Sequence, residues 1–217
     1  MNPKCALFDF DGTLFDSMYV WDNVGELFLR SQGRTPKPKL RDKLCTMSLY
    51  QCACFFQRDY ALPMSPEAIM DQFTELVARR YAEEILPKNG AVALLKTLRR
   101  RGISVGIVTA SERTLVESAL LRCNMLDLID RIFTCSEIGR GKDSPDIFRR
   151  AMEYFAADRS TTLIFEDALH AAATAKADGF AVAAVLDSHE PQQESLQRIA
   201  DFYFTNLGEF EPSRFFD

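Results

Sequence analysis

Short apolar runs alternate along this chain with longer stretches in which the hydrophobic residues have helical spacing. That alternation predicts a parallel β-sheet with helices packed on its faces, which is an α/β fold. Helical spacing covers residues 91–101 and stops before Gly102, and an alanine-rich stretch stops before Gly179, as expected where helices end at glycine. The predicted strands cover residues 5–10, 104–109, 131–134, 162–165 and 181–186.

One long segment interrupts the alternation. From about Met18 to Glu84 the hydrophobic residues have helical spacing, and no strand pattern lies between them. Two Ser-Pro pairs, Ser65–Pro66 in this segment and Ser144–Pro145 outside it, predict helices with serine as N-cap and proline at the first position. We therefore predict a core domain of residues 1–16 and 87–217, with a helical domain of residues 17–86 inserted into it.

Composition limits the classes of partner. The net charge of −5 disfavours nucleic acid. No window approaches the roughly 18 uncharged residues that a membrane span requires, and no long apolar run follows a basic region at the start. The six cysteines are scattered, which favours reduced core thiols over zinc ligands or disulfides. We expect a cytoplasmic protein that binds neither nucleic acid nor membrane.

Acidic residues interrupt the first apolar run, LFDFDGTLFDS. If its strand extends to Phe10, Asp9 and Asp11 project to the same side, at the sheet edge where open α/β folds bind ligands. A second pair, Glu166 and Asp167, ends the strand TLIFED. Close carboxylates need a compensating cation or a shared proton, and Mg²⁺ takes oxygen ligands. The two strand ends therefore predict a metal site.

Four segments together resemble the motifs of the haloacid dehalogenase-like (HAD) hydrolase superfamily. In chain order they read DFDGTLFDS, GIVTAS, GKDSPDIF and IFEDALHAAATAKADGF. The resemblance covers nearly the whole chain and is weakest through the inserted helices. It is greatest to the β-phosphoglucomutase-like and phosphoglycolate phosphatase-like branch, whose helical cap follows the first motif. The resemblance implies a Rossmann-like, HAD-like core with an inserted α-helical cap domain.

The resemblance also implies roles for the acidic residues. Asp9 looks like the nucleophile that forms an aspartyl phosphate, and Asp11 looks like the general acid and base. The expected cofactor is Mg²⁺, held by the carboxylates of Asp9 and Asp167 and the backbone carbonyl of Asp11, with Glu166 as support or alternative ligand.

Phosphate binding is assigned in the same way. The Thr109 hydroxyl and the Ala110 amide would donate to phosphoryl oxygens, and Lys142 would neutralise charge on the phosphoryl group and the nucleophile. One departure concerns Asp143, because relatives commonly have proline after this lysine. Asp143 adds negative charge near the phosphate site unless it points away, and it could pair with Lys142.

The motifs favour one reaction and leave others open. The presence of Asp11 favours phosphoryl transfer over dehalogenation. Trp21 stands where β-phosphoglucomutases carry a cap histidine, which favours a Mg²⁺-dependent phosphatase of a small phosphorylated metabolite, of the sugar phosphate or phosphoglycolate class. The alternatives are a sugar phosphate mutase and a catalytically silent phosphate-binding or signalling module. A monomer is the family expectation. Candidates for substrate selection in the cap are Arg41, Lys43, Ser48, Tyr50 and Arg58.

Overall fold

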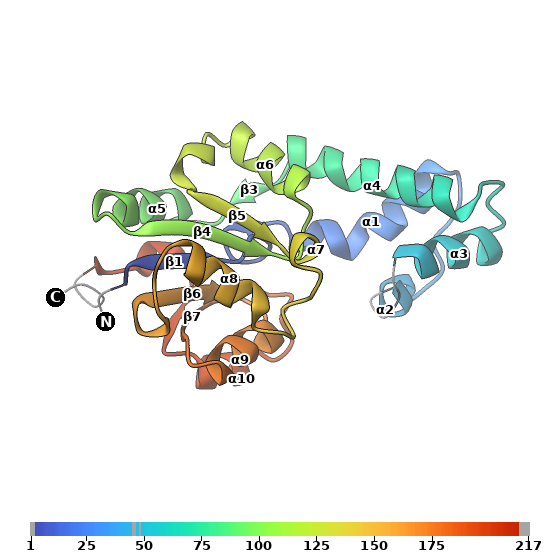
Figure 1. Ribbon diagram of the computed structural model, residues 1–217. Coiled ribbons are helices and arrows are strands. Elements are labelled where there is room, and N and C mark those ends of the chain that lie inside the picture. The colour runs from blue at the N-terminus through green and yellow to red at the C-terminus, as the bar shows by residue number, and fades with distance from the viewer. Residues whose placement is uncertain (1–2, 45–46, 48, 213–217) are drawn as a thin grey trace. The chain divides into compact units, whose positions relative to one another are not determined.

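A computed structural model describes residues 3–44, 47 and 49–212 (Figure 1). The chain divides into two compact units, and we describe each by itself. The core unit consists of residues Met1–Asp16 and Ile85–Asp217, and the helical unit is Ser17–Glu84. That these units serve as a catalytic core and a substrate-selecting cap stays a prediction.

The core unit is built on a six-stranded parallel sheet in the order β5-β4-β1-β6-β7-β8. β1 pairs on both sides, so that Leu7 lies beside Gly106 of β4 and Ile164 of β6. The predicted α/β fold with a parallel sheet is confirmed. The strands are β1 (Cys5–Phe8), β4 (Ser104–Thr109), β5 (Arg131–Thr134), β6 (Thr162–Glu166), β7 (Ala181–Val185) and β8 (Phe202–Phe204).

The first strand is shorter than predicted. β1 ends at Phe8, because the next residues form a tight loop in which the amides of Leu14 and Phe15 both donate to the Phe10 carbonyl. Gly12 has a φ of +75° in this loop, a conformation that favours glycine. The extended geometry that predicted Asp9 and Asp11 on one side of a strand is therefore wrong.

Two further strands, β2 (Phe15–Asp16) and β3 (Leu86–Pro87), lie where the chain leaves the core unit and where it returns. They pair antiparallel, with Phe15 opposite Pro87. Lys88 follows β3, and its Nζ lies 2.7 Å from Asp187 Oδ2, beyond the end of β7. The returning segment is thus attached to the core by a strand pair and a largely buried ion pair.

Helices cover both faces of the sheet in Figure 1. Gly102 has a φ of +71° just past the helix α5 (Ala91–Arg100), as predicted for a glycine that ends a helix. The helix predicted to begin at Pro145 begins at Asp146, with Pro145 at the N-cap position. The core helices are α5 (Ala91–Arg100), α6 (Arg113–Arg122), α7 (Cys135–Ile138), α8 (Asp146–Tyr154), α9 (Leu169–Ala177) and α10 (Gln193–Ile199).

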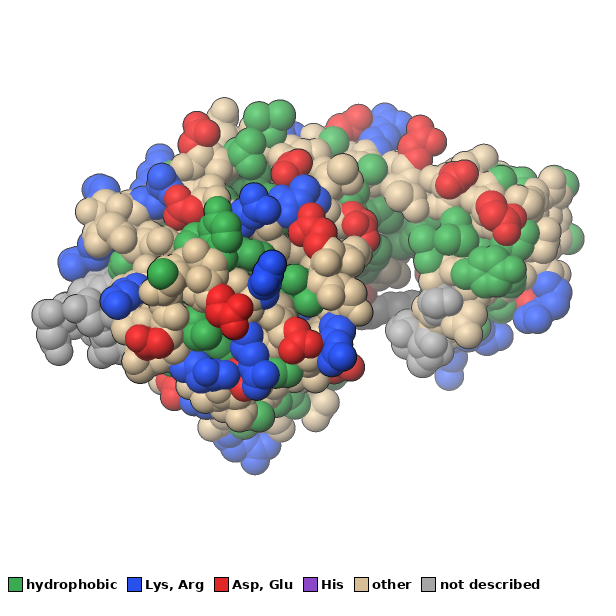
Figure 2. Space-filling model, viewed as in Figure 1, with side chains coloured by type: hydrophobic (Ala, Val, Ile, Leu, Met, Phe, Trp, Pro, Cys, Tyr) green, Lys and Arg blue, Asp and Glu red, His purple; other side chains and the backbone are tan. Residues whose placement is uncertain are grey.

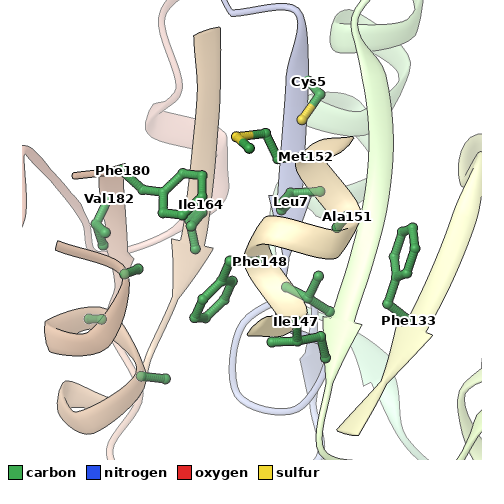
Figure 3. Packing of buried hydrophobic residues seen from close by; sticks show 14 of the residues in the cluster. Cys5, Leu7, Phe133, Ile147, Phe148, Ala151, Met152, Ile164, Phe180 and Val182 are labelled. Atoms are coloured by element: carbon green, nitrogen blue, oxygen red, sulfur yellow. The ribbon is translucent and has the colours of Figure 1, made fainter. Parts of the chain in front are cut away.

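The core packs on both sides of the sheet. On one side, Phe148 of α8 lies among residues of three strands, including Leu7, Ile164 and Val182 (Figure 3). Alternate strand residues face the opposite side, where the rings of Phe8 and Phe165 stack with centroids 4.2 Å apart. Burial of these apolar side chains stabilises the sheet that carries the acidic loops.

The described residues of the helical unit form the helices α1 (Met18–Ser31), α2 (Leu40–Leu44), α3 (Leu49–Asp59) and α4 (Pro66–Glu83). Its interior holds Phe28, Phe56 and Phe73, whose ring centroids are 5.4 to 6.4 Å apart. The Ser65 side chain accepts a hydrogen bond from the Ala68 amide at 3.2 Å, so the predicted cap of α4 is confirmed. In the part of the chain that the structure describes, every helix is too short or too polar to cross a membrane.

We predict that Phe148→Ala lowers the free energy of unfolding of the core unit by about 3–5 kcal/mol, because the removed ring is fully buried and leaves a cavity. Urea unfolding followed by circular dichroism measures the change. Leu121→Ala is the matched control, since Leu121 is 66% exposed on α6 and its truncation should change stability by less than about 0.5 kcal/mol. Equal losses in the two variants would contradict the packing described here.

Candidate active site

Three buried carboxylates meet at the carboxyl end of the sheet. Asp9 follows β1, Glu166 ends β6 and Asp167 follows it, and β1 and β6 are parallel neighbours. One carboxylate oxygen from each lies within 4.8 Å of the others, and the residues are 8%, 1% and 5% exposed. The sequence-predicted acidic residues Asp9, Glu166 and Asp167 are thus brought together.

A buried ammonium group lies among these carboxylates. Lys142 Nζ is 2.6 Å from Asp9 Oδ1 and 2.8 Å from Glu166 Oε2. Burial by itself lowers the pKa of Lys142, but the two carboxylates more than offset that effect and hold the pKa above its usual value. Lys142 is therefore positively charged at neutral pH.

The single positive charge of Lys142 lies among three carboxylic acid groups and cannot balance all of them if they are ionised. Burial, followed by the neighbouring carboxylates, raises the pKa of Glu166 to about 7 and raises that of Asp167 well above its usual value. The donors on offer are carboxylate oxygens, which are the ligands that Mg²⁺ prefers. Both the donor type and the excess negative charge fit a divalent cation.

The loop after β1 orients Asp167. Thr13 Oγ1 donates a hydrogen bond to Asp167 Oδ1 at 2.8 Å. Gly12 packs so closely that a Cβ atom there would lie 2.2 Å from Asp167 Oδ2. Glycine is required both for that approach and for the positive φ of this residue. Thr13 was not among the predicted site residues, although it stands inside the quoted first motif.

Asp11 lies in a different environment from Asp9. Its carboxylate accepts a hydrogen bond from the Ser111 hydroxyl, in the loop after β4. Among the described residues, the group of carboxylates close enough to share a metal contains Asp9, Glu166 and Asp167 and leaves Asp11 out. A metal contact through the Asp11 backbone carbonyl stays a prediction. Ser111 was not predicted, and its only signal is its place in the motif GIVTAS.

The predicted phosphate-binding residues lie at the end of β4. Thr109 is the last residue of that strand and is fully buried, and its Oγ1 accepts a hydrogen bond from the Ser111 amide at 3.0 Å. Ala110 follows and is exposed. The neighbouring residue of Lys142, Asp143, is also exposed, whereas Lys142 pairs with Asp9 and Glu166. Asp143 therefore does not take the ammonium group away from the site.

The candidate substrate-selecting residues belong to the helical unit. Arg58 pairs with Asp59 at 2.8 Å, the Lys43 ammonium lies 5.7 Å from the centroid of the Phe55 ring, and Tyr50 is exposed. Arg41 stands in α2, and Ser48 lies outside the described residues. Their part in substrate selection stays a prediction.

A family model described as haloacid dehalogenase-like hydrolase matches residues 6–185. The chain belongs to this family. A validoxylamine A 7'-phosphate phosphatase of Streptomyces hygroscopicus subsp. limoneus is 27% identical over 205 residues, which are 87% of this chain and 88% of the relative. A bifunctional riboflavin kinase/FMN phosphatase of Arabidopsis thaliana is also 27% identical over 205 residues, which are 94% of this chain but 53% of that protein.

The solved structures agree on the fold. CbbY of Rhodobacter sphaeroides, solved in complex with phosphate, matches with a TM-score of 0.77 and 22% identity, over 95% of this chain and 96% of that one. The predicted HAD family and fold are confirmed, and so is the predicted enzyme class, a phosphohydrolase of this family.

We predict that the metal-free protein becomes less stable as the pH rises from 5 to 7. Glu166, whose pKa rises from the ordinary 4.5 to about 7 on folding, binds more protons in the folded state within this window, so the free energy of unfolding falls with pH. The fall is on the order of 2–3 kcal/mol and is measured by urea unfolding in a chelator.

Adding Mg²⁺ should oppose this fall, because the cation favours the ionised carboxylates. Glu166→Gln is the control, and its slope between pH 5 and 7 should be shallower than that of the wild type. Metal-free protein that gains stability over the same pH range would contradict the raised pKa values.

Proposed function

We propose that the protein is a Mg²⁺-dependent phosphatase that hydrolyses a small phosphorylated metabolite through an aspartyl-phosphate intermediate. The observation that carries the proposal is the buried group formed by Asp9, Lys142, Glu166 and Asp167. It combines a carboxylate nucleophile, a fixed ammonium and acidic metal ligands, which phosphoryl transfer needs for positioning and charge stabilisation. Relatives named as phosphatases of phosphorylated small molecules support the substrate class.

Asp9 is the proposed nucleophile. One of its carboxylate oxygens attacks phosphorus, the bond from phosphorus to the leaving oxygen breaks, and an aspartyl phosphate forms. The Lys142 ammonium beside Asp9 Oδ1 favours the ionised carboxylate. Attachment of Asp9 directly after a central strand limits its movement, so the attacking oxygen is held in place.

Asp11 is the proposed general acid and base. It donates a proton to the leaving oxygen as that oxygen departs, and the alcohol is released. It then accepts a proton from the water that attacks the aspartyl phosphate, which yields inorganic phosphate and regenerates Asp9. The Ser111 hydroxyl, which donates to the Asp11 carboxylate, holds that carboxylate in position. Ser111 is therefore a positioning residue.

We assign phosphate recognition to Thr109 and Ala110 at the end of β4 and to Lys142. The Thr109 hydroxyl retains its proton for a phosphoryl oxygen, because in its bond with the Ser111 amide its oxygen is the acceptor. The Ala110 amide is the second proposed donor. Lys142 provides the positive charge that remains in place throughout the reaction.

Asp9 and Asp167 would hold Mg²⁺, with Glu166 as support or alternative ligand and the Asp11 carbonyl as a further one. A bound Mg²⁺ would offset the negative charge that gathers on the phosphoryl oxygens. Both Glu166 oxygens already have partners, Lys142 Nζ at 2.8 Å and the Ala168 amide at 3.4 Å. This arrangement favours Glu166 in the supporting role.

The mutase alternative is weaker because of Trp21. Its indole has no basic nitrogen, and the indole N–H donates to the Tyr81 hydroxyl at 3.0 Å. Trp21 therefore cannot serve as the general base that a histidine could provide. We propose substrates of the sugar phosphate or phosphoglycolate class, while the cytoplasmic location and the monomeric state stay predictions.

We predict Mg²⁺-dependent release of inorganic phosphate from at least one member of a panel of hexose phosphates, pentose phosphates, phosphoglycolate and nucleotides. Asp9→Asn should lower kcat on the order of 10³-fold or more, because the amide is a poor nucleophile. Asp11→Asn should lower it by about 10²–10⁴-fold through loss of proton transfer. A colorimetric phosphate assay, with and without a chelator, measures these effects.

Asp127→Asn is the matched control, since Asp127 is an exposed acid outside the site, and its kcat should stay within about twofold of wild type. Interconversion of sugar phosphate isomers without phosphate release would favour the mutase. A folded, Mg²⁺-loaded protein that neither releases phosphate nor isomerises sugar phosphates would contradict the enzyme and favour a phosphate-binding role.

A further inference from the structure

The helix α9 begins directly beyond the acidic residues of the candidate active site, and its first residue, Leu169, stands two positions after Asp167. The first amides of a helix have no partner within the helix, and a Ser, Thr, Asp or Asn side chain at the N-cap position usually accepts hydrogen bonds from them. The N-cap residue of α9 is Ala168, whose side chain makes no such bond. The start of α9 therefore depends on an acceptor from elsewhere in the chain.

Glu190, in the loop between β7 and α10, supplies that acceptor. Its Oε2 accepts a hydrogen bond from the Leu169 amide at 2.9 Å, and its Oε1 accepts one from the Gln192 amide at 2.8 Å. Figure 2 shows acidic and basic side chains interspersed over the surface of the core unit. Other carboxylates of this unit form ion pairs, as Asp201 does with Lys176 at 2.7 Å. Each oxygen of Glu190 instead accepts from a backbone amide, so this side chain joins its own loop to the start of α9.

The loop that carries Glu190 is itself held in place. Asp187 is 4% exposed, its Oδ2 pairs with Lys88 Nζ at 2.7 Å, and its Oδ1 accepts from the His189 amide at 2.9 Å. The Asp187 carbonyl accepts from the Gln193 side chain at 2.6 Å and from the Glu190 amide at 3.3 Å. The Glu190 carboxylate is therefore attached to a fixed backbone and can hold the start of α9 in one position.

The position of α9 affects the acidic group through Asp167. Gly12 approaches Asp167 Oδ2 so closely that a Cβ atom there would lie 2.2 Å away, so this carboxylate fits the site in a narrow range of positions. Without Glu190, the carboxylates nearest along the chain to the amide that it leaves are those of Glu166 and Asp167. Acidic side chains readily bond to backbone amides a few residues away. A carboxylate that turned towards α9 in this way would withdraw an oxygen from a cation.

We propose that Glu190 is a positioning residue for the metal site, because it bonds the helix start for which the proposed metal ligands would otherwise compete. The inference rests on the proposed function, in which Asp9 and Asp167 hold Mg²⁺. Groups that orient metal ligands contribute about 10–100-fold in metal affinity. Glu190 acts through the backbone that follows Asp167, so its loss should have an effect near the lower end of that range.

The test measures the affinity for Mg²⁺, which a merely structural role of Glu190 would leave unchanged. The full-length protein is freed of metal with a chelator, which is then removed, and its thermal unfolding is followed at increasing MgCl₂ and constant ionic strength. The stabilisation of each variant relative to its own metal-free state gives its Kd for Mg²⁺. Glu190→Ala should raise this Kd by about tenfold.

Two variants serve as controls. Glu190→Gln removes the charge but keeps an oxygen acceptor for the Leu169 amide, so its Kd should stay within about threefold of wild type. Asp158 accepts from the Thr161 amide at 3.1 Å in a similar capping role, at the opposite end of β6. Asp158→Ala and Glu190→Ala should each lower the metal-free urea midpoint by roughly 0.5 M. Asp158→Ala should nevertheless leave the Kd within about twofold of wild type, because it lies far from the acidic group.

Three results would overturn the positioning role. The first is an unchanged Kd in Glu190→Ala. The second is an equal rise in Glu190→Gln and Glu190→Ala, which would assign the effect to the lost charge and not to the lost hydrogen bond. The third is an equal rise in Asp158→Ala, which would assign the effect to a general loss of stability.

Phosphate release separates this inference from the function on which it rests. In the active enzyme, Glu190→Ala should need about tenfold more Mg²⁺ for half-maximal rate, with kcat at saturating Mg²⁺ within about threefold of wild type. The expected pattern of Kd values without hydrolysis of any phosphomonoester supports the positioning role and overturns the phosphatase. Hydrolysis that persists in a chelator, with no stabilisation of the wild type by Mg²⁺, overturns the metal site and the positioning role and leaves a hydrolase.

Discussion

The contact of one buried ammonium group with two buried carboxylates holds the candidate active site together. Lys142 precedes α8, Asp9 follows β1 and Glu166 ends β6, so three separate segments converge on one charge. Removing Lys142 would leave carboxylates buried with no positive charge beside them, which is strongly unfavourable. The local fold and the proposed chemistry thus depend on the same interaction, and a divalent cation would balance the negative charge that remains on the carboxylates.

Much of the fold could be predicted because its strands are buried on both sides and so have continuous apolar sequences. β4 and β5 begin and end where predicted. The predicted β1 is too long because Phe10 is apolar and buried; Phe10 lies in the loop after β1, and its ring packs on that of Phe15 at the start of β2, with centroids 4.5 Å apart. β8 has three residues, too few for a pattern. Hydrophobicity reports burial, and only backbone pairing distinguishes a strand from a packed loop.

The same limit applies to helix starts and to the site. Both Ser-Pro pairs have the composition of a helix start, yet only Ser65 makes the cap. Before Pro145, the Ser144 amide donates to the Gly141 carbonyl in the turn that carries Lys142, and the helix starts later. The predicted acidic residues and Lys142 meet because they lie at or near strand ends. Thr13 and Ser111 orient the carboxylates of Asp167 and Asp11 through side-chain hydrogen bonds, which residue spacing in the sequence does not predict.

The pairing of β2 with β3 has a consequence for how such a protein can diversify. Phe15 and Pro87 lie opposite each other, so the chain leaves the core and returns to it at neighbouring points. A segment whose two ends are that close can be exchanged for another of different length or composition with little change in the sheet or the acidic loops. The inserted segment can therefore change between related proteins while the sheet and the acidic loops of the core unit stay the same.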